Sequence, residues 1–243
     1  MKNFSIIYDS RLKYLASLLS KLTGSEAFSS TSSTFSSGER FIVLWSYMGR
    51  ASAETEKLKN LIESISSVGY VEALLLLPSL HQRDNEISDF TEQMHKIEEI
   101  GRIIFFDLTP ISKLGVTGKP AINLSAFPIL ISKFKQMNLR AKVITFNGEL
   151  LVQCKVIENS IGKSEKNILI IDNYIEDPSS LKPIILTYFE KMYNVYVFST
   201  YFAKDPSSLS SIANVITTNT IMWNNIETID IAPSIAEFIK AVA

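Results

Sequence analysis

The sequence predicts an α/β fold made of two similar halves, each a mostly parallel sheet flanked by helices. Short apolar segments alternate with segments of helical periodicity along the whole chain. One apolar segment, residues 73–77, is continuous, which is typical of a strand covered on both faces of a parallel sheet. The strand–helix rhythm then begins again after a junction near residues 117–120.

The first half is predicted to contain four main strands and three helices. Gly24 and Gly101 are predicted to end helices. The Ser/Thr-rich residues 25–38 are predicted to form a half-buried strand and a turn, with a flexible linker as the alternative. The strands are expected at 4–8, 41–45, 73–77 and 102–106, and the helices at 11–22, 54–68 and 87–100.

The second half repeats this pattern with shorter elements. Strands are expected at 141–146, 167–171, 195–199, 215–218 and 226–231, and helices at 126–137, 149–158, 179–192, 206–213 and 233–242. We therefore expect one domain over residues 1–120 and a second over 121–243. The terminal helix is free to pack on either of them.

Composition excludes several classes of function. The 24 Lys and Arg residues are balanced by 25 Asp and Glu, so no basic excess points to nucleic acid. The apolar runs are too short to cross a membrane, and the N-terminal run is too short for a signal peptide, so a cytoplasmic protein is expected. Cys154 is the only cysteine, which excludes an internal disulfide and a cysteine-based zinc cluster, and its neighbours predict a buried core position.

Polar residues follow the predicted strands, where ligands of parallel sheets bind. These segments are 46–50, 78–84, 107–109, 147–148 and 172–177. Their mixture of carboxylates and arginines suits a phosphorylated, magnesium-bound ligand. Solvated loops of any α/β protein show the same residue types, so this alternative stays open.

Five segments, taken in order along the chain, are similar to the motifs of one family. They are Phe-Ser-Ser-Gly-Glu at 35–39, the strand with Pro-Ser-Leu-His-Gln-Arg-Asp at 74–84, Phe-Asp-Leu-Thr at 106–109, the segment 168–181, and Ile-Asp-Ile-Ala-Pro-Ser-Ile-Ala-Glu-Phe-Ile at 229–239. The sequence thereby resembles the ribose-phosphate pyrophosphokinases, which synthesise phosphoribosyl pyrophosphate (PRPP). The resemblance spans nearly the whole chain and implies two domains of phosphoribosyltransferase type.

The segment after residue 171 departs from the family's phosphoribosyl loop. Asp172 keeps the first carboxylate, whereas Asn173 and Glu176 stand where the family has aspartates. The family's Thr-Gly-Gly-Thr turn is replaced by Asp177-Pro178-Ser179-Ser180. Proline removes an amide donor, and a carboxylate beside the phosphate position repels an anion. The alternative interpretation is a helix start capped by Asp177.

Other catalytic features of the family are also altered. The resemblance places Thr109 at the family's catalytic histidine, and a hydroxyl cannot carry a proton near neutral pH. The loop that holds catalytic Lys and Arg is shortened, and only Lys155, Lys163 and Lys166 lie in that interval. The family's glycine-rich ribose-phosphate segment is reduced to residues 147–149. The segment His81-Gln82-Arg83-Asp84 is similar to the ATP-contacting segment, with a solvated loop capped by Asp84 as the alternative.

These departures predict a catalytically inactive homologue that serves as a regulatory or structural subunit in PRPP metabolism. It would assemble with itself or with an active synthase and would need no cofactor, and no metal ligands are assigned. Trp45, Tyr47, Met48, Met222 and Trp223 are the expected interface residues. The alternative is an active, diverged ribose-phosphate diphosphokinase or phosphoribosyltransferase, which would use ATP and magnesium.

Overall fold

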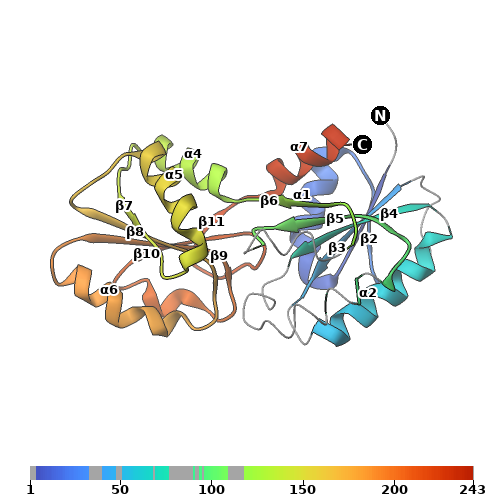
Figure 1. Ribbon diagram of the computed structural model, residues 1–243, viewed down its shortest axis with the longest axis horizontal. Coiled ribbons are helices and arrows are strands. Elements are labelled where there is room, and N and C mark those ends of the chain that lie inside the picture. The colour runs from blue at the N-terminus through green and yellow to red at the C-terminus, as the bar shows by residue number, and fades with distance from the viewer. Residues whose placement is uncertain are drawn as a thin grey trace. The chain divides into compact units, whose positions relative to one another are not determined.

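The computed structural model describes residues 4–32, 40–47, 51–67, 69–76, 90, 93–94, 96–108 and 118–242. The chain forms two compact units, one of Met1–Leu124 with Ala232–Ala243 and one of Ser125–Ile231 (Figure 1). The terminal helix α7 (Ala232–Val242), whose place the sequence left open, belongs to the first unit and packs beside α1 (Lys13–Thr23).

The first unit is built on a six-stranded sheet of order β2-β1-β3-β4-β5-β6, in which the strand pairings of the described residues are all parallel. Helices α1 and α7 lie on one face of this sheet and α2 on the other (Figure 1). The elements are β1 (Ser5–Tyr8), η1 (Ser10–Leu12), β2 (Ala27–Ser29), β3 (Arg40–Ser46), α2 (Ala51–Ser66), β4 (Tyr70–Leu76), β5 (Ile100–Phe106) and β6 (Ala121–Leu124).

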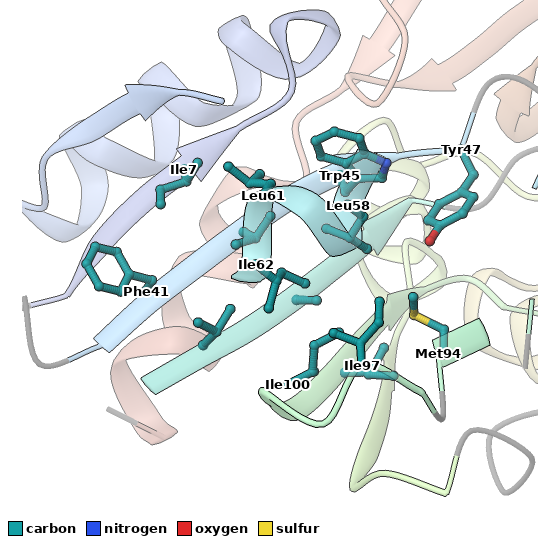
Figure 2. Packing of buried hydrophobic residues seen from close by; sticks show 14 of the residues in the cluster. Ile7, Phe41, Trp45, Tyr47, Leu58, Leu61, Ile62, Met94, Ile97 and Ile100 are labelled. Carbon is teal, nitrogen blue, oxygen red and sulfur yellow. The ribbon is translucent and has the colours of Figure 1, made fainter. Parts of the chain in front are cut away.

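The core between α2 and this sheet follows from two periodicities. Phe41 and Val43, which alternate along β3, belong to the same buried cluster as Leu58 and Ile62, which are one turn apart on α2. Figure 2 shows Phe41, Leu58 and Ile62 in this cluster. Trp45 and Tyr47 continue the same alternation and are buried in this core, so the prediction that they form an interface is wrong. Met48 lies outside the described residues.

Three charged side chains also lie within the first sheet, on β3, β4 and β5. Glu72 is buried, and its Oε2 atom lies 2.5 Å from Nη2 of Arg40. Nη1 of Arg102 lies 3.5 Å from the other carboxylate oxygen. The two guanidinium groups compensate a carboxylate whose burial would otherwise be costly.

The second unit is built on a five-stranded sheet of order β11-β10-β9-β8-β7, whose pairings are again parallel. Helices α4 and α5 lie on one face and α6 on the other (Figure 1). The elements are α4 (Phe127–Gln136), β7 (Lys142–Ile144), η4 (Gly148–Leu150), α5 (Leu151–Ile161), β8 (Asn167–Ile175), η5 (Pro178–Leu181), α6 (Lys182–Phe189), β9 (Asn194–Phe202), η6 (Pro206–Leu209), β10 (Asn214–Thr218) and β11 (Glu227–Ile229).

The predicted α/β class with parallel sheets is confirmed, and so is the helix end at Gly24, whose φ of 72° and bond to the Ser20 carbonyl form a left-handed cap. Gly101 does not end a helix. It lies in β5 at a shift of register against β4, where a Cβ atom would meet the end of the Tyr70 side chain. Glycine is common at such bulges, and in the sequence it gives the same signal as a helix stop.

Two further differences concern strand ends. The short strand β6 was not predicted, and β8 continues to Ile175 although the sequence predicted its end at residue 171.

Cys154 is a free, buried thiol on α5, as predicted. Among the described helices, none is long and apolar enough to span a bilayer.

Candidate functional site

The carboxyl edge of the second sheet gathers the residues that the sequence singled out. Asn147 follows β7, and Asp172 lies on the neighbouring strand β8. The side-chain amide of Asn147 hydrogen-bonds to the Asp172 carboxylate, while its Oδ1 atom accepts the Glu149 N–H at 3.1 Å. The amide therefore links two strand ends and starts η4.

The carboxylate of Asp172 is half-buried and already has several partners. Burial raises its pKa, and backbone N–H groups of Tyr174 and Asn173, together with the Asn147 amide, oppose that rise. The Tyr174 N–H lies 3.4 Å from Oδ1. The thiol of Cys154 lies in the same electrostatic environment: burial first, and the Asp172 charge second, raise its pKa to about 11. Asp172 is thus held from several sides within the fold.

The first two residues of the expected phosphoribosyl loop, Asp172 and Asn173, lie within strand β8. Asp172 pairs with Ser199, Tyr174 with Tyr201 and Ile175 with Phe202 on β9. Asn173 lies between these pairs and is only 2% exposed. A side chain so deeply buried is not presented to a ribose hydroxyl.

The turn after β8 is closed by the side chain of Asp177. Its Oδ1 atom accepts the Ser179 N–H at 2.9 Å and the Ser179 hydroxyl at 2.6 Å, and Lys204 donates to Oδ2 at 3.0 Å. The bonds from Ser179 and then Lys204 lower the pKa of Asp177 to about 2. Pro178 occupies the first position of η5, so the interpretation as a capped helix start is confirmed.

The same turn is built twice. Residues 177–181 and 205–209 share the sequence Asp-Pro-Ser-Ser-Leu, and each follows a strand of the same sheet. Asp205 caps η6 through the Ser207 N–H at 2.9 Å, as Asp177 caps η5, and η5 and η6 are in contact. Sequence reasoning missed this repeat, although the identical pentapeptides are its signal. Its recurrence identifies a strand-ending motif.

The remaining predicted residues are dispersed or not described. Glu176 and Ser180 are exposed, and the Ser180 hydroxyl donates to the Asp177 carbonyl at 2.7 Å. The interval expected to hold a catalytic loop contains α5, and Lys163 pairs with Glu158 at 3.2 Å. Residues 35–39, Thr109 and the segment His81-Gln82-Arg83-Asp84 lie outside the described residues.

The end of β5 in the first unit is also held by the fold. Asp107 is buried with φ of 51°, a left-handed conformation that aspartate tolerates better than most residues, and its N–H donates to the Leu124 carbonyl at 2.7 Å. The Asn123 side chain bonds to both the N–H and the carbonyl of Leu108, at 2.9 and 3.0 Å. The segment is therefore fixed to β6 directly before residue 109.

The described residues do not fit a magnesium site at the edge of the second sheet. Over the described ranges, no three His, Cys, Asp or Glu side chains gather as a metal site would require. The residue after Asp172 is an amide, and Asp177 is occupied by Ser179 and Lys204. This donor set lacks the carboxylate pair that magnesium and its phosphate ligands usually share.

The two units together define the class of fold, which is that of a PRPP synthetase. Among solved structures, the chain is similar to phosphoribosylpyrophosphate synthetase from Mycobacterium smegmatis, with a TM-score of 0.80, 16% sequence identity and 99% of each chain covered. The resemblance predicted from the sequence is confirmed at the level of the fold. No family model and no curated protein matches the sequence.

Proposed function

We propose that this chain is a catalytically inactive homologue of the PRPP synthetases, which serves as a regulatory or structural subunit in PRPP metabolism. The observation that carries the proposal is the closed turn at Asp177. Its carboxylate accepts the Ser179 N–H at the start of η5, in the segment that resembles the family's phosphate-binding turn. A backbone N–H that is bonded to a side-chain carboxylate is not free to bind phosphate.

Three neighbouring features support the same conclusion. Pro178 contributes no N–H group, and the residues from Asp172 to Ile175 are fixed in the ladder with β9. The negative charge of Asp177 repels a phosphate at close range, and the charge of Lys204 at 3.0 Å offsets part of that repulsion. Loss of one positioned acid–base or electrostatic group often lowers a rate by about 10²–10⁴. The replacement of the family histidine by Thr109 and the shortened lysine loop add to these losses.

A protein with this fold and a closed site acts through the surfaces it presents. We therefore propose that it assembles with itself or with an active synthase, and that neither ATP nor magnesium is needed for that assembly. The alternative, an active and diverged ribose-phosphate diphosphokinase, requires the Asp177 turn to open and its carboxylate to leave the Ser179 N–H.

Calorimetry with ribose 5-phosphate, with and without magnesium, tests the proposal directly. We expect no heat of binding at millimolar ligand and no conversion of ATP to AMP by the purified chain, whereas an active PRPP synthetase in the same buffer gives both. Magnesium-dependent binding that disappears in Asp172→Asn, but persists in the matched control Asp205→Asn, would refute the proposal and favour the active enzyme.

A further inference from the structure

Helices α4 and α6, which lie on opposite faces of the second sheet, end in the same backbone motif (Figure 1). At the end of α6, the Tyr193 N–H donates to the Tyr188 carbonyl at 3.1 Å. The Met192 N–H donates to the Phe189 carbonyl at 2.9 Å, and Met192 has a φ of 63°. Asn138, with a φ of 50°, takes the place of Met192 in the same pair of bonds at the end of α4. These are Schellman motifs, whose left-handed position is usually glycine or asparagine.

Met192 is therefore an unusual residue at its position. Asparagine adopts a positive φ more readily than most residues, as Asn138 does, whereas the methionine side chain has no polar group to compensate. Packing offers no compensation either, because Met192 is 88% exposed, the largest fraction among the exposed large apolar residues of the described ranges. A strained residue that the fold does not use points to a role in binding.

The turn that holds Met192 leads directly to the amino edge of the second sheet. The Asn194 N–H donates to the Lys166 carbonyl at 2.8 Å, so the starts of β8 and β9 lie side by side. The side-chain amide of Asn194 donates to Oδ1 of Asn167 at 2.9 Å. The amide of Asn167 in turn donates to the carbonyl of Arg140, just before β7, at 2.7 Å. These bonds join three strand starts into one continuous edge.

This edge has an excess of positive charge. Five exposed cations and two exposed carboxylates lie at its strand starts and helix ends, whereas the whole chain has a net charge of -1. The cations are Lys135, Arg140, Lys142, Lys166 and Lys191. The carboxylates are Glu165 and Glu190. The ion pairs Lys133–Glu227 and Lys163–Glu158, at the same edge, add no net charge.

Exposed apolar side chains stand among these cations. Besides Met192, Met137 at the end of α4 is 47% exposed and Phe189 at the end of α6 is 48% exposed. We call this surface, with its five cations and three apolar side chains, the basic edge. Cations combined with exposed large apolar side chains are typical of proteins that lie on a membrane surface.

We propose that the basic edge binds the surface of an anionic phospholipid membrane, with Met192, Phe189 and Met137 entering the headgroup region. The cations are attracted to the negative surface potential of such a membrane. Nucleic acid fits less well, because methionine offers neither an aromatic ring for base stacking nor a hydrogen-bond donor.

The spread of the apolar residues also favours lipid over an acidic protein. They stand at the ends of helices on opposite faces of the sheet, and a membrane accepts apolar groups at any spacing. The contact is peripheral and leaves the candidate site free, because that site lies at the other ends of the same strands. The inference therefore holds whether or not the candidate site is catalytically active.

Flotation of the full chain with vesicles tests the proposal. We expect binding to phosphatidylcholine vesicles with ~30% phosphatidylglycerol to be at least about 10-fold tighter than to phosphatidylcholine alone, at ~0.1 M salt. At ~0.5 M salt this preference should disappear, because salt screens exposed charges. Lys166→Gln with Lys191→Gln should weaken binding by about 10-fold or more. Lys13→Gln with Lys21→Gln, which removes two exposed lysines from α1 in the first unit, is the matched control and should leave binding unchanged.

At Met192, binding and stability should move in opposite directions. Met192→Asn removes an apolar side chain and supplies the residue that the turn prefers. It should weaken vesicle binding by about 5-fold or more and raise the thermal midpoint by ~2–5 °C, whereas a purely structural role predicts no loss of binding. Val152→Asn, which changes a 70% exposed residue in the first turn of α5, is the apolar control and should keep the wild-type binding.

Several results would overturn the proposal. They are equal binding to both kinds of vesicle, no binding to either at ~1 mM lipid, and unchanged binding by Met192→Asn. Binding to single-stranded RNA or to polyglutamate that anionic vesicles do not compete away would assign the basic edge to nucleic acid or to an acidic protein instead.

Discussion

Replacing Glu72 with Gln removes a buried carboxylate from between the buried guanidinium group of Arg40 and the half-buried one of Arg102. The side chains of Glu72 and Arg40 are 2% and 9% exposed, so the substitution removes the ion pair between them in a nearly dry environment. Breaking such a buried pair costs about 3–5 kcal/mol of unfolding free energy. Arg102 adds little to this figure, because its side chain is 28% exposed and lies 3.5 Å away.

The two tryptophans allow each unit to be followed separately. Trp45 lies in β3 of the first unit and Trp223 in the second unit, and the chain has no other tryptophan. In a Trp223→Phe background, the fluorescence of Trp45 reports urea unfolding of the first unit. With a slope of ~2 kcal/mol per molar urea, Glu72→Gln should lower the midpoint by about 1.5–2.5 M. In a Trp45→Phe background, the Trp223 transition should not move.

Glu63→Gln is the matched control, because Glu63 also pairs with a cation but on the surface of α2. Lys59 and Glu63 are 46% and 47% exposed, and such a pair contributes only about 0.5 kcal/mol or less. A loss below 1 kcal/mol for Glu72→Gln at an unchanged slope would show that the buried cluster does not hold the first sheet together. Equal losses in both variants would show the same.

Three further outcomes follow from the structure. The pKa of Asp177 is lowered from 3.8 to about 2, so its charged form stabilises the second unit at any pH above 3.8. This contribution to the free energy of unfolding is lost as the pH falls toward 2. Asp177→Asn should therefore flatten the pH dependence of urea unfolding, followed by the fluorescence of Trp223. Raising the pKa of Cys154 from 9.0 to about 11 lowers its thiolate fraction about 100-fold, so iodoacetamide at pH ~8 should react far more slowly with the native chain than with the chain in urea. Gly101→Ala should lower the free energy of urea unfolding of the first unit by about 1 kcal/mol or less. The added methyl group would meet Tyr70, which is 47% exposed and can turn its side chain outward. A loss above about 3 kcal/mol would mean that the bulge itself cannot hold a side chain.

Local sequence patterns were sufficient for most of the fold. Helical spacing and continuous apolar runs marked nearly every described element, and Gly24 marked a helix end correctly, because these signals depend on neighbours in the chain. The extent of β8 could not be predicted in this way. Its last residues are held by β9, some 27 positions further along, and only that pairing turns the polar Asp172 and Asn173 into strand.

Burial at the end of β3 shows the same limit. The sequence predicts Trp45 and Tyr47 as exposed apolar residues of an interface. The structure buries both against α2 and adjoining elements, and the Tyr47 hydroxyl lies 3.2 Å from the hydroxyl of Thr55 on that helix. A partner eight residues away on another element is visible only once the helix is packed on the sheet.

The contacts of the candidate site are also of two kinds, those between adjacent residues and those between residues far apart in the sequence. Asp177, Pro178 and Ser179 form a cap that depends on adjacent residues, so the sequence could predict it. The ion pair of Asp177 with Lys204 and the hydrogen bond from the Asn147 side-chain amide to Asp172 come from neighbouring strand ends and could not be predicted. These distant contacts fix the cap and Asp172 in place within the folded unit.

The turn after β8 is held by contacts within the folded second unit. A buried cluster of the second unit lies between the strands and α6, and it reaches the carboxyl edge through Leu181 of η5 and Leu209 of η6. At that edge, a capping carboxylate and a bound phosphate compete for the same N–H groups at the start of η5. Asp177 accepts the Ser179 N–H and is itself paired with Lys204, and Asp205 caps η6 on the next strand in the same way. Under the proposed function, this cap takes an N–H group that a phosphate would otherwise bind.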